Sequence, residues 1–437
     1  MANSVNPATT PRHSDNYGAQ NPKRRSDILA RLAQFKKLIG NLELDEGPYT
    51  DQLTENLLSA ALLYQALDEH SSALDYLNKA QHVSRINRGL DTLEQVPILQ
   101  ARRDSYLALG ELEKADAAQE ALFTLQQELY GNDNPDLIPA LKALGEWNQQ
   151  AFLDRSNILL NIPRIDLQSF LNDVNNYRKN IEDTRTTPLF KLYQAQQNFQ
   201  QAINIAIKQR AFDHPDLMTL ERLLLTSYLL HAHRENILYE PDFYLSRKKT
   251  KTGSRLNHAN LELRDSDNYR MGQDSFKRRI SYLKNKPQPE AQELVNILFE
   301  TADWHLLFGH KVVAADAYQQ AYDLLLTDPE AAVRIQTLLY PETPVILPIY
   351  LPPPNSREKL GISAHEEVNF FAYFDVSFAI DKFGKAKNIT ILDKAGDISK
   401  NTEIRFQQYL AKVLFRPRFK DGKPDTAIIF LRYSVGA

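Results

Sequence analysis

The sequence predicts a mostly α protein: an α-solenoid of stacked helix pairs, followed by a small C-terminal α+β (ββαβ) domain with a three-stranded antiparallel sheet. The first observation is a helical spacing of apolar residues, with internal repeats, that runs for about 300 residues from Ile28. The second is a change to alternating apolar and polar side chains in roughly the last 70 residues, which is the period of a half-buried strand.

Residues 1–26 are rich in Asn, Pro, Ser and Thr and contain few apolar side chains. A segment of this kind buries too little apolar surface to offset the entropy lost on ordering. We therefore expect a disordered tail, with the helical array occupying residues 27–340.

The helical array repeats a small–large–small spacing that is typical of a second helix packed tightly against the first. Its copies are Ala73, Leu77 and Ala80; Ala195, Phe199 and Ala202; and Ala314, Tyr318 and Ala321. Large aromatic residues recur on the preceding helices at Tyr64, Tyr106 and Trp147, in steps of 42 and 41 residues. Repeats at a fixed step indicate stacked helix pairs.

Two connecting turns have related sequences, Gly-Asn-Asp-Asn-Pro-Asp at residues 131–136 and Asp-His-Pro-Asp at residues 213–216. Asn134 and His214 stand where a side chain caps the next helix, and the proline after each fits the first helical turn. On these turns and on the alanine positions, the array resembles tetratricopeptide repeats. The resemblance implies a concave groove that binds proteins, and helical phase suggests as groove candidates Gln65, Asp104 and Asn148.

Residues 245–288 fit no repeat and carry twelve Lys or Arg against four Asp or Glu. We expect a basic insertion or an atypical helix. A nucleic-acid contact is one interpretation, in which Tyr269 and Phe276 would stack on bases. The basic cluster of that interpretation is Arg247, Lys248, Lys249 and Lys251. No recognised nucleic-acid-binding module surrounds the segment, so a solvated surface loop is the simpler interpretation.

Residues 341–362 are assigned to a linker, because six prolines stand between Pro341 and Ser356. Such a composition predicts a semi-rigid polyproline II spacer and not a strand. Apolar residues between the prolines favour a linker that packs along the protein surface.

Residues 363–437 form the predicted ββαβ domain. Phe374 to Ile380 alternate as a strand, Gly384 supplies a turn, and a second β-rich run follows at residues 385–393. A short helical spacing then ends at Pro417. The last strand is predicted over Thr426, Ala427, Ile428, Ile429, Phe430, Leu431, Arg432 and Tyr433.

This order of elements resembles the C-terminal domain of the TonB family. The matching residues are Gly384, Phe415, Arg416, Pro417, Asp421 and Gly422, followed by the apolar last strand. The resemblance implies a periplasmic recognition domain that binds a partner peptide by strand addition along the last strand. An edge strand has unpaired backbone groups that make this mode plausible. The alternative is a last strand that is central or paired with a second copy.

The chain has no cysteine, which excludes disulfides and thiolate metal sites. No catalytic, metal-ligand or cofactor-binding motif is visible, so we expect a protein that is not an enzyme and uses no cofactor. No apolar run approaches the length of a membrane span, and no secretory signal is visible. Export would require that a signal peptide has been removed, and a cytoplasmic location stays open.

The absence of catalytic motifs and the repeats predict a non-enzymatic protein–protein interaction protein, and the resemblance to the TonB family implies that it is periplasmic and belongs to the bacterial cell envelope. Its expected partners are proteins or peptides, including outer-membrane or envelope proteins and the TonB transport system. One alternative is a structural scaffold or assembly factor of an envelope complex or a homo-oligomer. Another is a cytoplasmic nucleic-acid binder that uses residues 245–288.

Overall fold

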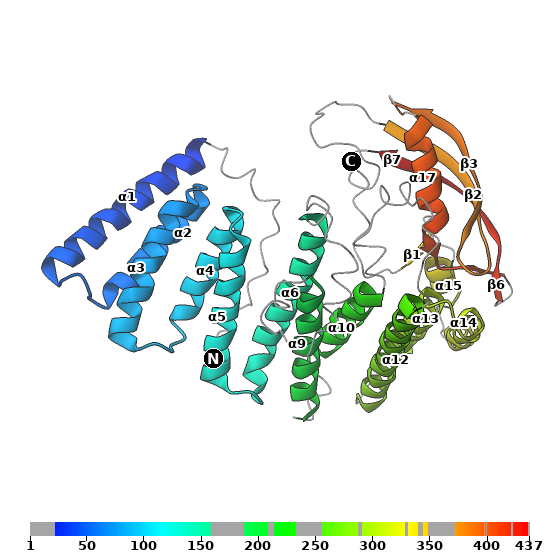
Figure 1. Cartoon of the computed structure of the whole chain (residues 1–437), viewed down its shortest axis with the longest axis horizontal. Coiled ribbons are helices and arrows are strands. Elements are labelled where there is room, and N and C mark those ends of the chain that lie inside the picture. Colours follow the sequence, from blue (N-terminus) through cyan, green and yellow to red (C-terminus); the bar gives the residue numbers. More distant parts are fainter. Residues whose placement is uncertain are drawn as a thin grey trace. The chain divides into compact units, whose positions relative to one another are not determined.

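The computed structural model describes residues 22–158, 188–208, 214–232, 256–286, 291–327, 331–339, 344–347, 372–396, 398, 400–420 and 423–435. It divides the chain into two compact units, residues 1–147 and 148–437. Figure 1 shows the described elements of both units. The predicted mostly helical class is confirmed, as is the small three-stranded antiparallel sheet near the C-terminus.

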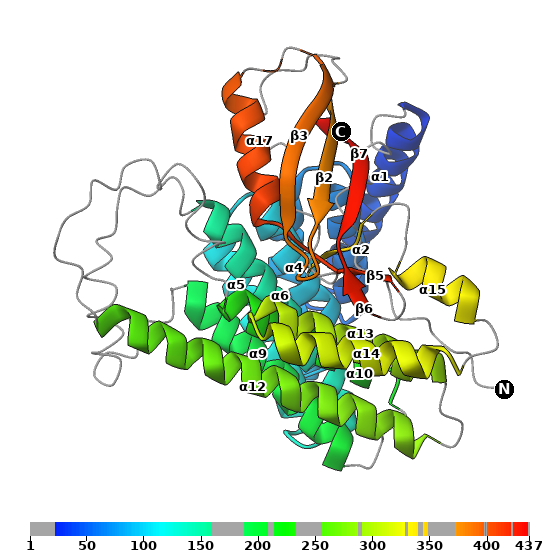
Figure 2. The same cartoon turned by 90° about the vertical axis from the view of Figure 1, so that its right-hand side faces the viewer.

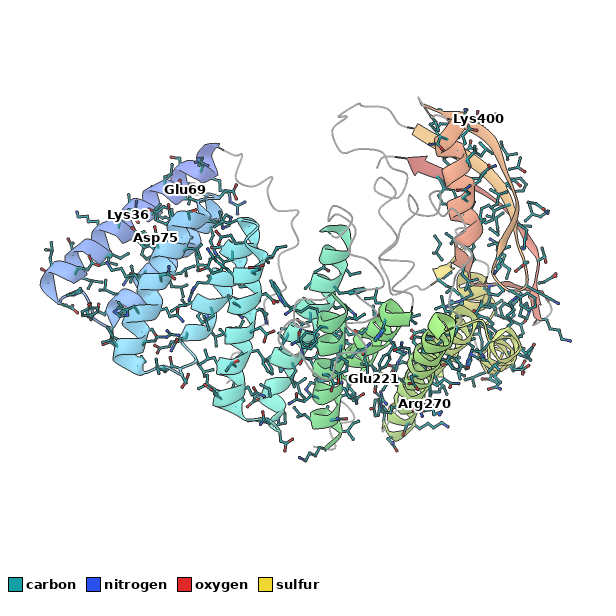
Figure 3. All side chains as sticks on the ribbon, viewed as in Figure 1. Lys36, Glu69, Asp75, Glu221, Arg270 and Lys400 are labelled. Atoms are coloured by element: carbon teal, nitrogen blue, oxygen red, sulfur yellow. The ribbon has the colours of Figure 1, made fainter. Side chains whose placement is uncertain are left out.

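The first unit is built from helices that pack in sequence order. They are α1 (Pro22–Asp45), α2 (Gln52–Ala66), α3 (His70–Arg88), α4 (Gln95–Ala108), α5 (Leu112–Tyr130), the 3-10 helix η2 (Pro135–Leu137) and α6 (Ile138–Ile158), which continues into the second unit. Helices α2 and α3 form one antiparallel pair and α4 and α5 the next (Figure 1). On α1, the Lys36 ammonium lies 5.1 Å from the ring centre of Tyr64 on α2, and Figure 3 labels this lysine.

The predicted small–large–small positions lie in the buried faces of their helix pairs. All nine side chains are at most 1% exposed. On α5, Ala115 and Leu122 keep the outer two positions of this spacing, and Gln119, buried at 2% exposure, takes the middle position. Its amide oxygen accepts a hydrogen bond of 2.8 Å from Arg103, so this polar substitution in the repeat does not leave an unpaired buried group.

The two turn motifs cap helices as their sequences predict. The side-chain oxygen of Asn134 accepts a hydrogen bond of 3.0 Å from the backbone N–H of Asp136. Nδ1 of His214 accepts the equivalent bond from Asp216 at 3.2 Å. Each satisfies a backbone donor that the first helical turn leaves free.

The second unit contains the remaining helices and all described strands. The helices are α9 (Pro188–Lys208), α10 (Leu217–Ala232), α12 (Leu256–Asn285), α13 (Ala291–Leu307), α14 (Lys311–Leu325), α15 (Ala331–Leu339) and α17 (Lys400–Lys412). The strands are β1 (Ile346–Leu347), β2 (Ala372–Ile380), β3 (Ala386–Ala395), β4 (Leu414–Phe415), β5 (Arg418–Lys420), β6 (Lys423–Asp425) and β7 (Ala427–Val435). The main sheet has the order β3-β2-β7, and two short pairs, β1-β4 and β5-β6, accompany it. Figure 2 shows α17 beside this sheet.

Helix α12 is held between α10 and α13 by buried ion pairs. Glu221 on α10 is fully buried and accepts two hydrogen bonds from Arg278, at 2.7 and 2.8 Å. Figure 3 labels Glu221 beside α12. Arg279, 1% exposed, donates to Glu300 on α13 at 2.6 Å. These cations are therefore matched by carboxylates of the same unit.

Helices α12 and α13 also pack against each other through a cluster of aromatic side chains, apart from the ion pair of Arg279 with Glu300. A Cβ atom placed on Gly272 would lie 1.9 Å from the ring of the buried Trp304, so the two helices approach closely at this glycine. The Tyr269 hydroxyl lies 2.8 Å from Nδ1 of His305, and the Tyr269 ring stacks on His310 with centroids 4.1 Å apart. Burial, and then the charge of His310, lower the pKa of His305.

Two elements differ from the predictions, and a third decides between two alternatives. Helix α1 begins at Pro22, inside the segment assigned to the tail, and residues 1–21 lie outside the described part. The part of the basic segment that the structure describes is one helix, α12, which agrees with the atypical helix and not with a surface loop. Within the linker, Ile346 and Leu347 form a strand that pairs with β4, although we expected no strand there. Neither residue is a proline, so both keep the N–H that a strand requires.

Candidate functional site

The predicted partner-binding strand lies at an edge of the sheet. In the order β3-β2-β7, β7 pairs with β2 on one side, and no other described strand pairs with it. The pairing runs from Ala427 to Val435 with no register shift. Among the described residues, the other side of β7 therefore has backbone N–H and C=O groups that no strand pairs, as an edge strand does.

The two faces of β7 have different surroundings. Ile429 is buried in the core that the sheet shares with α17, and Leu431 and Tyr433 pack against the same core. Ile428 and Phe430 point to the opposite face and are 67% and 70% exposed. Two large apolar side chains thus stand in solvent beside the unpaired edge.

On the exposed face of β7, the charged residue Arg432 follows the apolar residues Ile428 and Phe430. Its guanidinium makes two hydrogen bonds to Asp375 on β2, at 2.7 and 2.6 Å, and lies 3.9 Å from the ring centre of Tyr373. The hydrogen bonds from Arg432 lower the pKa of the Asp375 carboxyl. Thr426, the first residue of the predicted strand, precedes β7 and donates its N–H to Asp425.

The opposite edge, β3, is less suited to accept a strand. Its register with β2 shifts twice, which marks bulges, and Asn388 has a positive φ of 53°. Charged side chains also line it, among them Lys387, Asp393 and Lys394. Bulges and charges are the usual protection of sheet edges, and β7 has no bulge.

The family-motif residues hold the sheet on the last helix pair. The N–H of Phe415 donates to the carbonyl of Gly384 at 2.8 Å, and the N–H of Arg416 donates to Val345 in the linker at 2.9 Å. A Cβ on Gly384, whose φ is +76°, would lie 2.0 Å from the Phe415 carbonyl oxygen. Pro417 is buried beside them, while Asp421 and Gly422 lie outside the described residues, between β5 and β6.

A buried ion pair between Arg416 and Asp303, which we call the anchor, joins this part of the chain to α13. Arg416 donates Nε to Asp303 on α13 at 3.1 Å and a second nitrogen to the other carboxylate oxygen. The two side chains are 7% and 3% exposed. Burial works to lower the pKa of Arg416, but the Asp303 charge raises it, so the guanidinium stays charged.

Aromatic residues of α14 complete the same contact. The Tyr318 hydroxyl donates to Asp303 at 2.5 Å, and burial followed by the Asp303 charge raises its pKa well above the usual value. Phe419 on β5 stacks on Tyr322 with an interplanar angle of 7°. The motif residue Arg416 and the neighbouring Phe419 therefore attach this domain to α13 and α14. The sequence analysis identified the motif residues but did not predict that they make this contact.

The three groove candidates have different environments. Gln65 on α2 donates to the Ala101 carbonyl at 2.6 Å and to Ser105 at 2.7 Å, so it links α2 to α4. Asp104 is exposed and bonded to its neighbour Arg103. Asn148 is 0% exposed, which is incompatible with direct contact to a partner, so its selection as a groove residue was wrong. Helical phase alone cannot separate a groove position from a packing position.

The base-stacking candidates of the basic segment are engaged within the chain. Phe276 is 1% exposed and packs edge-on against Trp304, while Tyr269 contacts the two histidines described above. The basic cluster at residues 247–251 lies outside the described residues. In the part of the chain that the structure describes, no group of three His, Asp or Glu residues could hold a metal ion, and no helix is long and apolar enough to cross a membrane.

Comparisons with known proteins give little further guidance. No protein-family model matches the chain, and no curated protein matches it. Solved structures include one described as a kinesin light chain of Podosopora anserina with nearly identical TPR-like repeats, and a single-substitution variant of it. Both are 10% identical to this chain. The unsubstituted protein has a TM-score of 0.36 and covers 64% of this chain and 98% of its own. The variant has a TM-score of 0.35 and covers 65% of this chain and 99% of its own. Scores of this size do not establish a shared function.

Proposed function

We propose that this chain is a non-enzymatic protein–protein interaction protein that recruits a partner by strand addition to β7. One observation carries the proposal: β7 is an edge strand without a bulge, and its side chains Ile428 and Phe430 are exposed. An incoming strand would gain backbone hydrogen bonds along the edge. It would also cover part of the two apolar side chains, each worth roughly 1.5–3 kcal/mol when fully buried.

The fixed position of the sheet on α13 and α14 supports this role. The ion pair of Arg416 with Asp303 ties the segment after α17 to α13, and the β1-β4 pair ties the linker strand to the same segment. A preorganised edge loses less entropy on binding than a sheet on a flexible tether. We further propose a periplasmic location with envelope or TonB-system partners, which rests on the resemblance of the motif and of the last strand.

The experiment is a titration of the isotope-labelled, intact protein with extended peptides from envelope proteins, followed by backbone amide shifts. We expect shifts along residues 427–435 and adjacent β2. Replacing both Ile428 and Phe430 by Lys should abolish them without loss of fold, because both side chains are exposed. The matched control is Leu392→Lys, an exposed apolar residue on the opposite edge strand. Shifts confined to β3, or equal losses in variant and control, would reject the assignment.

A scaffold or homo-oligomer is the second candidate, because the edge of β7 that faces no other described strand can pair with the β7 of another copy. Light scattering over a range of concentrations separates the two: a dimer that the double Lys variant dissociates favours self-pairing. Deleting residues 363–437 is a poor test, since it would expose the apolar surface of α13 and α14 that Phe419 covers. The proposed location is tested by fractionating cells that produce the protein from its native gene; recovery in the cytoplasm contradicts it.

A further inference from the structure

The first unit carries a hollow of about 470 Å³ between α3, α4 and α5, which we call the α3–α5 hollow. These helices lie side by side in Figure 1. Helix α4 supplies one stripe of side chains, Gln95, Leu99, Arg102 and Tyr106. Their spacing of four, three and four residues puts them on one face of the helix. The volume falls in the range of about 300–1,000 Å³ that is usual for ligand sites.

The hollow is not on the α2 side of α4. Ala101 and Ser105, which receive hydrogen bonds from α2, lie on another face of α4 and do not line it. Asp104, the sequence-based groove candidate, is two residues from Arg102 and therefore about 200° away around the helix. The hollow is thus separate from the groove that helical phase suggested.

Small side chains on α5 create the space. Ala117, Ala118 and Ala121 line the hollow along this helix, and none of them reaches beyond its Cβ. Below them, Leu99 and Leu125 are each 5% exposed and form an apolar floor. An occupant could bury small apolar groups against this wall and floor.

One end of the hollow is cationic and aromatic. The Arg102 guanidinium lies 6.0 Å and the Lys114 ammonium 5.7 Å from the ring centre of Tyr106. Lys114 is bonded to Glu111, at 2.7 Å. Arg102 donates one terminal nitrogen to Gln81 and forms no ion pair with a carboxylate among the described residues. This end therefore carries a guanidinium charge that an anionic group of a ligand could balance.

The other end carries Asp91 and Glu128 beside Arg85. Because α4 and α5 are antiparallel, Glu128 and the start of α4 lie together, far from Lys114. Fourteen residues separate Lys114 from Glu128 on α5, or about 21 Å of helix. The hollow is therefore long and dipolar, positive near Tyr106 and negative near Glu128.

We propose that the α3–α5 hollow binds an extended, dipolar peptide segment of another protein. About six residues in extended form span 21 Å at roughly 3.4 Å per residue. An acidic side chain of the segment reaches Arg102, small residues lie along the α5 alanines, and a basic side chain reaches Asp91 and Glu128. Nucleic acid and anionic lipid fit less well, since their charges all have one sign and would meet the two carboxylates.

The test is selection of hexapeptides from a displayed random library on the immobilised, intact protein. We expect enriched sequences with an acidic residue at one end, a basic residue at the other and small residues between. The affinity of a labelled, selected peptide is then measured by fluorescence anisotropy. Arg102→Glu should lower this affinity about tenfold or more, because the variant loses one charge-assisted hydrogen bond to the peptide. Replacing the acidic residue of the peptide by lysine should restore binding to that variant.

Two further variants make the outcome unambiguous. Lys37→Glu on the exposed face of α1 makes the same charge change outside the hollow and should leave affinity within about twofold, as expected for screened surface charges. Ala121→Trp fills the hollow from an exposed position and should block binding while circular dichroism shows an unchanged fold. No enriched binder, binders without charge order, or binding that survives both Arg102→Glu and Ala121→Trp would overturn the proposal.

Discussion

Breaking the ion pair between Asp303 and Arg416 should strongly destabilise the second unit. Asp303→Ala leaves the Arg416 guanidinium, 7% exposed, without its counter-charge, and it also removes the acceptor of the Tyr318 hydroxyl. Removing one partner of a buried pair costs about 3–5 kcal/mol, and a lost hydrogen bond about 1 kcal/mol. We expect a loss near the upper end, about 5 kcal/mol.

Replacing the other partner should cost less. In Arg416→Met, the Asp303 carboxylate loses the guanidinium but still accepts a hydrogen bond of 2.5 Å from Tyr318. A loss of about 3 kcal/mol follows from the lower end of the same range. The double variant should cost less than the sum of the two, with a coupling energy of about 2–3 kcal/mol, because it leaves no unpaired charge.

The chain offers a clean fluorescence assay for this series. It contains two tryptophans, Trp147 and Trp304, and Trp304 is fully buried in α13 next to Asp303. A Trp147→Phe background makes Trp304 the reporter of the second unit in urea unfolding. The loss of about 5 kcal/mol in Asp303→Ala should also lower the melting temperature of a unit of this size by roughly 10–15 °C.

The matched control is Asp375→Ala on the exposed face of the sheet. Asp375 makes the same two-bond contact, at 2.7 and 2.6 Å, with Arg432, whose side chain is 58% exposed. Solvent screens this pair, so its loss should change stability far less. If Asp303→Ala cost no more than Asp375→Ala, the reasoning that burial makes the anchor strong would be refuted.

Three more predictions concern single positions. Gly384→Ala should cost about 3 kcal/mol more than Gly309→Ala in urea unfolding, because both have positive φ but only Gly384 approaches another backbone closely; equal losses would argue against that close approach. Gly272→Ala should destabilise the protein although alanine favours helices, whereas Gly40→Ala, with open space around it, should stabilise it by about 0.5–1 kcal/mol. The lowered pKa of His305 means that the folded state prefers the neutral ring, so stability should be complete above about pH 6.5 and decline as the pH falls below it. His305→Gln should remove that part of the decline in a pH series of melting curves, and an unchanged pH profile would exclude the histidine as its source.

The sequence predicted the elements whose signal is local. The alternation from Phe374 to Ile380 identifies β2, and all four apolar residues of that run are at most 1% exposed. The alanine positions of the helix pairs identify their buried faces for the same reason, since a periodic pattern reports directly which side of an element is covered. The caps of Asn134 and His214 depend on only two or three neighbouring residues.

Features that depend on distant contacts could not be predicted in this way. Asp303 and Arg416 are 113 residues apart, and neither has a local pattern that names the other. The β1 strand exists because β4 lies beside it, while its own sequence favours a proline-rich spacer. The α3–α5 hollow arises from three alanines that the pattern marks only as helix-forming, so helical phase pointed to Asp104 on the opposite face of α4.

The ion pair of Arg416 with Asp303 shares no residue with the edge strand β7. The motif that resembles the TonB family is occupied inside the chain, since Phe415 is fully buried and Arg416 is bonded to Asp303. If a partner strand adds to β7 as we propose, its selectivity must therefore come from the exposed positions of β7, chiefly Ile428 and Phe430. Below the melting temperature of Asp303→Ala, the affinity of a β7-binding peptide should thus equal that of the unchanged protein, as measured by titration calorimetry. A loss of affinity in the folded variant would instead mean that the anchor shapes the edge, and that strand addition depends on where α13 and α14 hold the sheet.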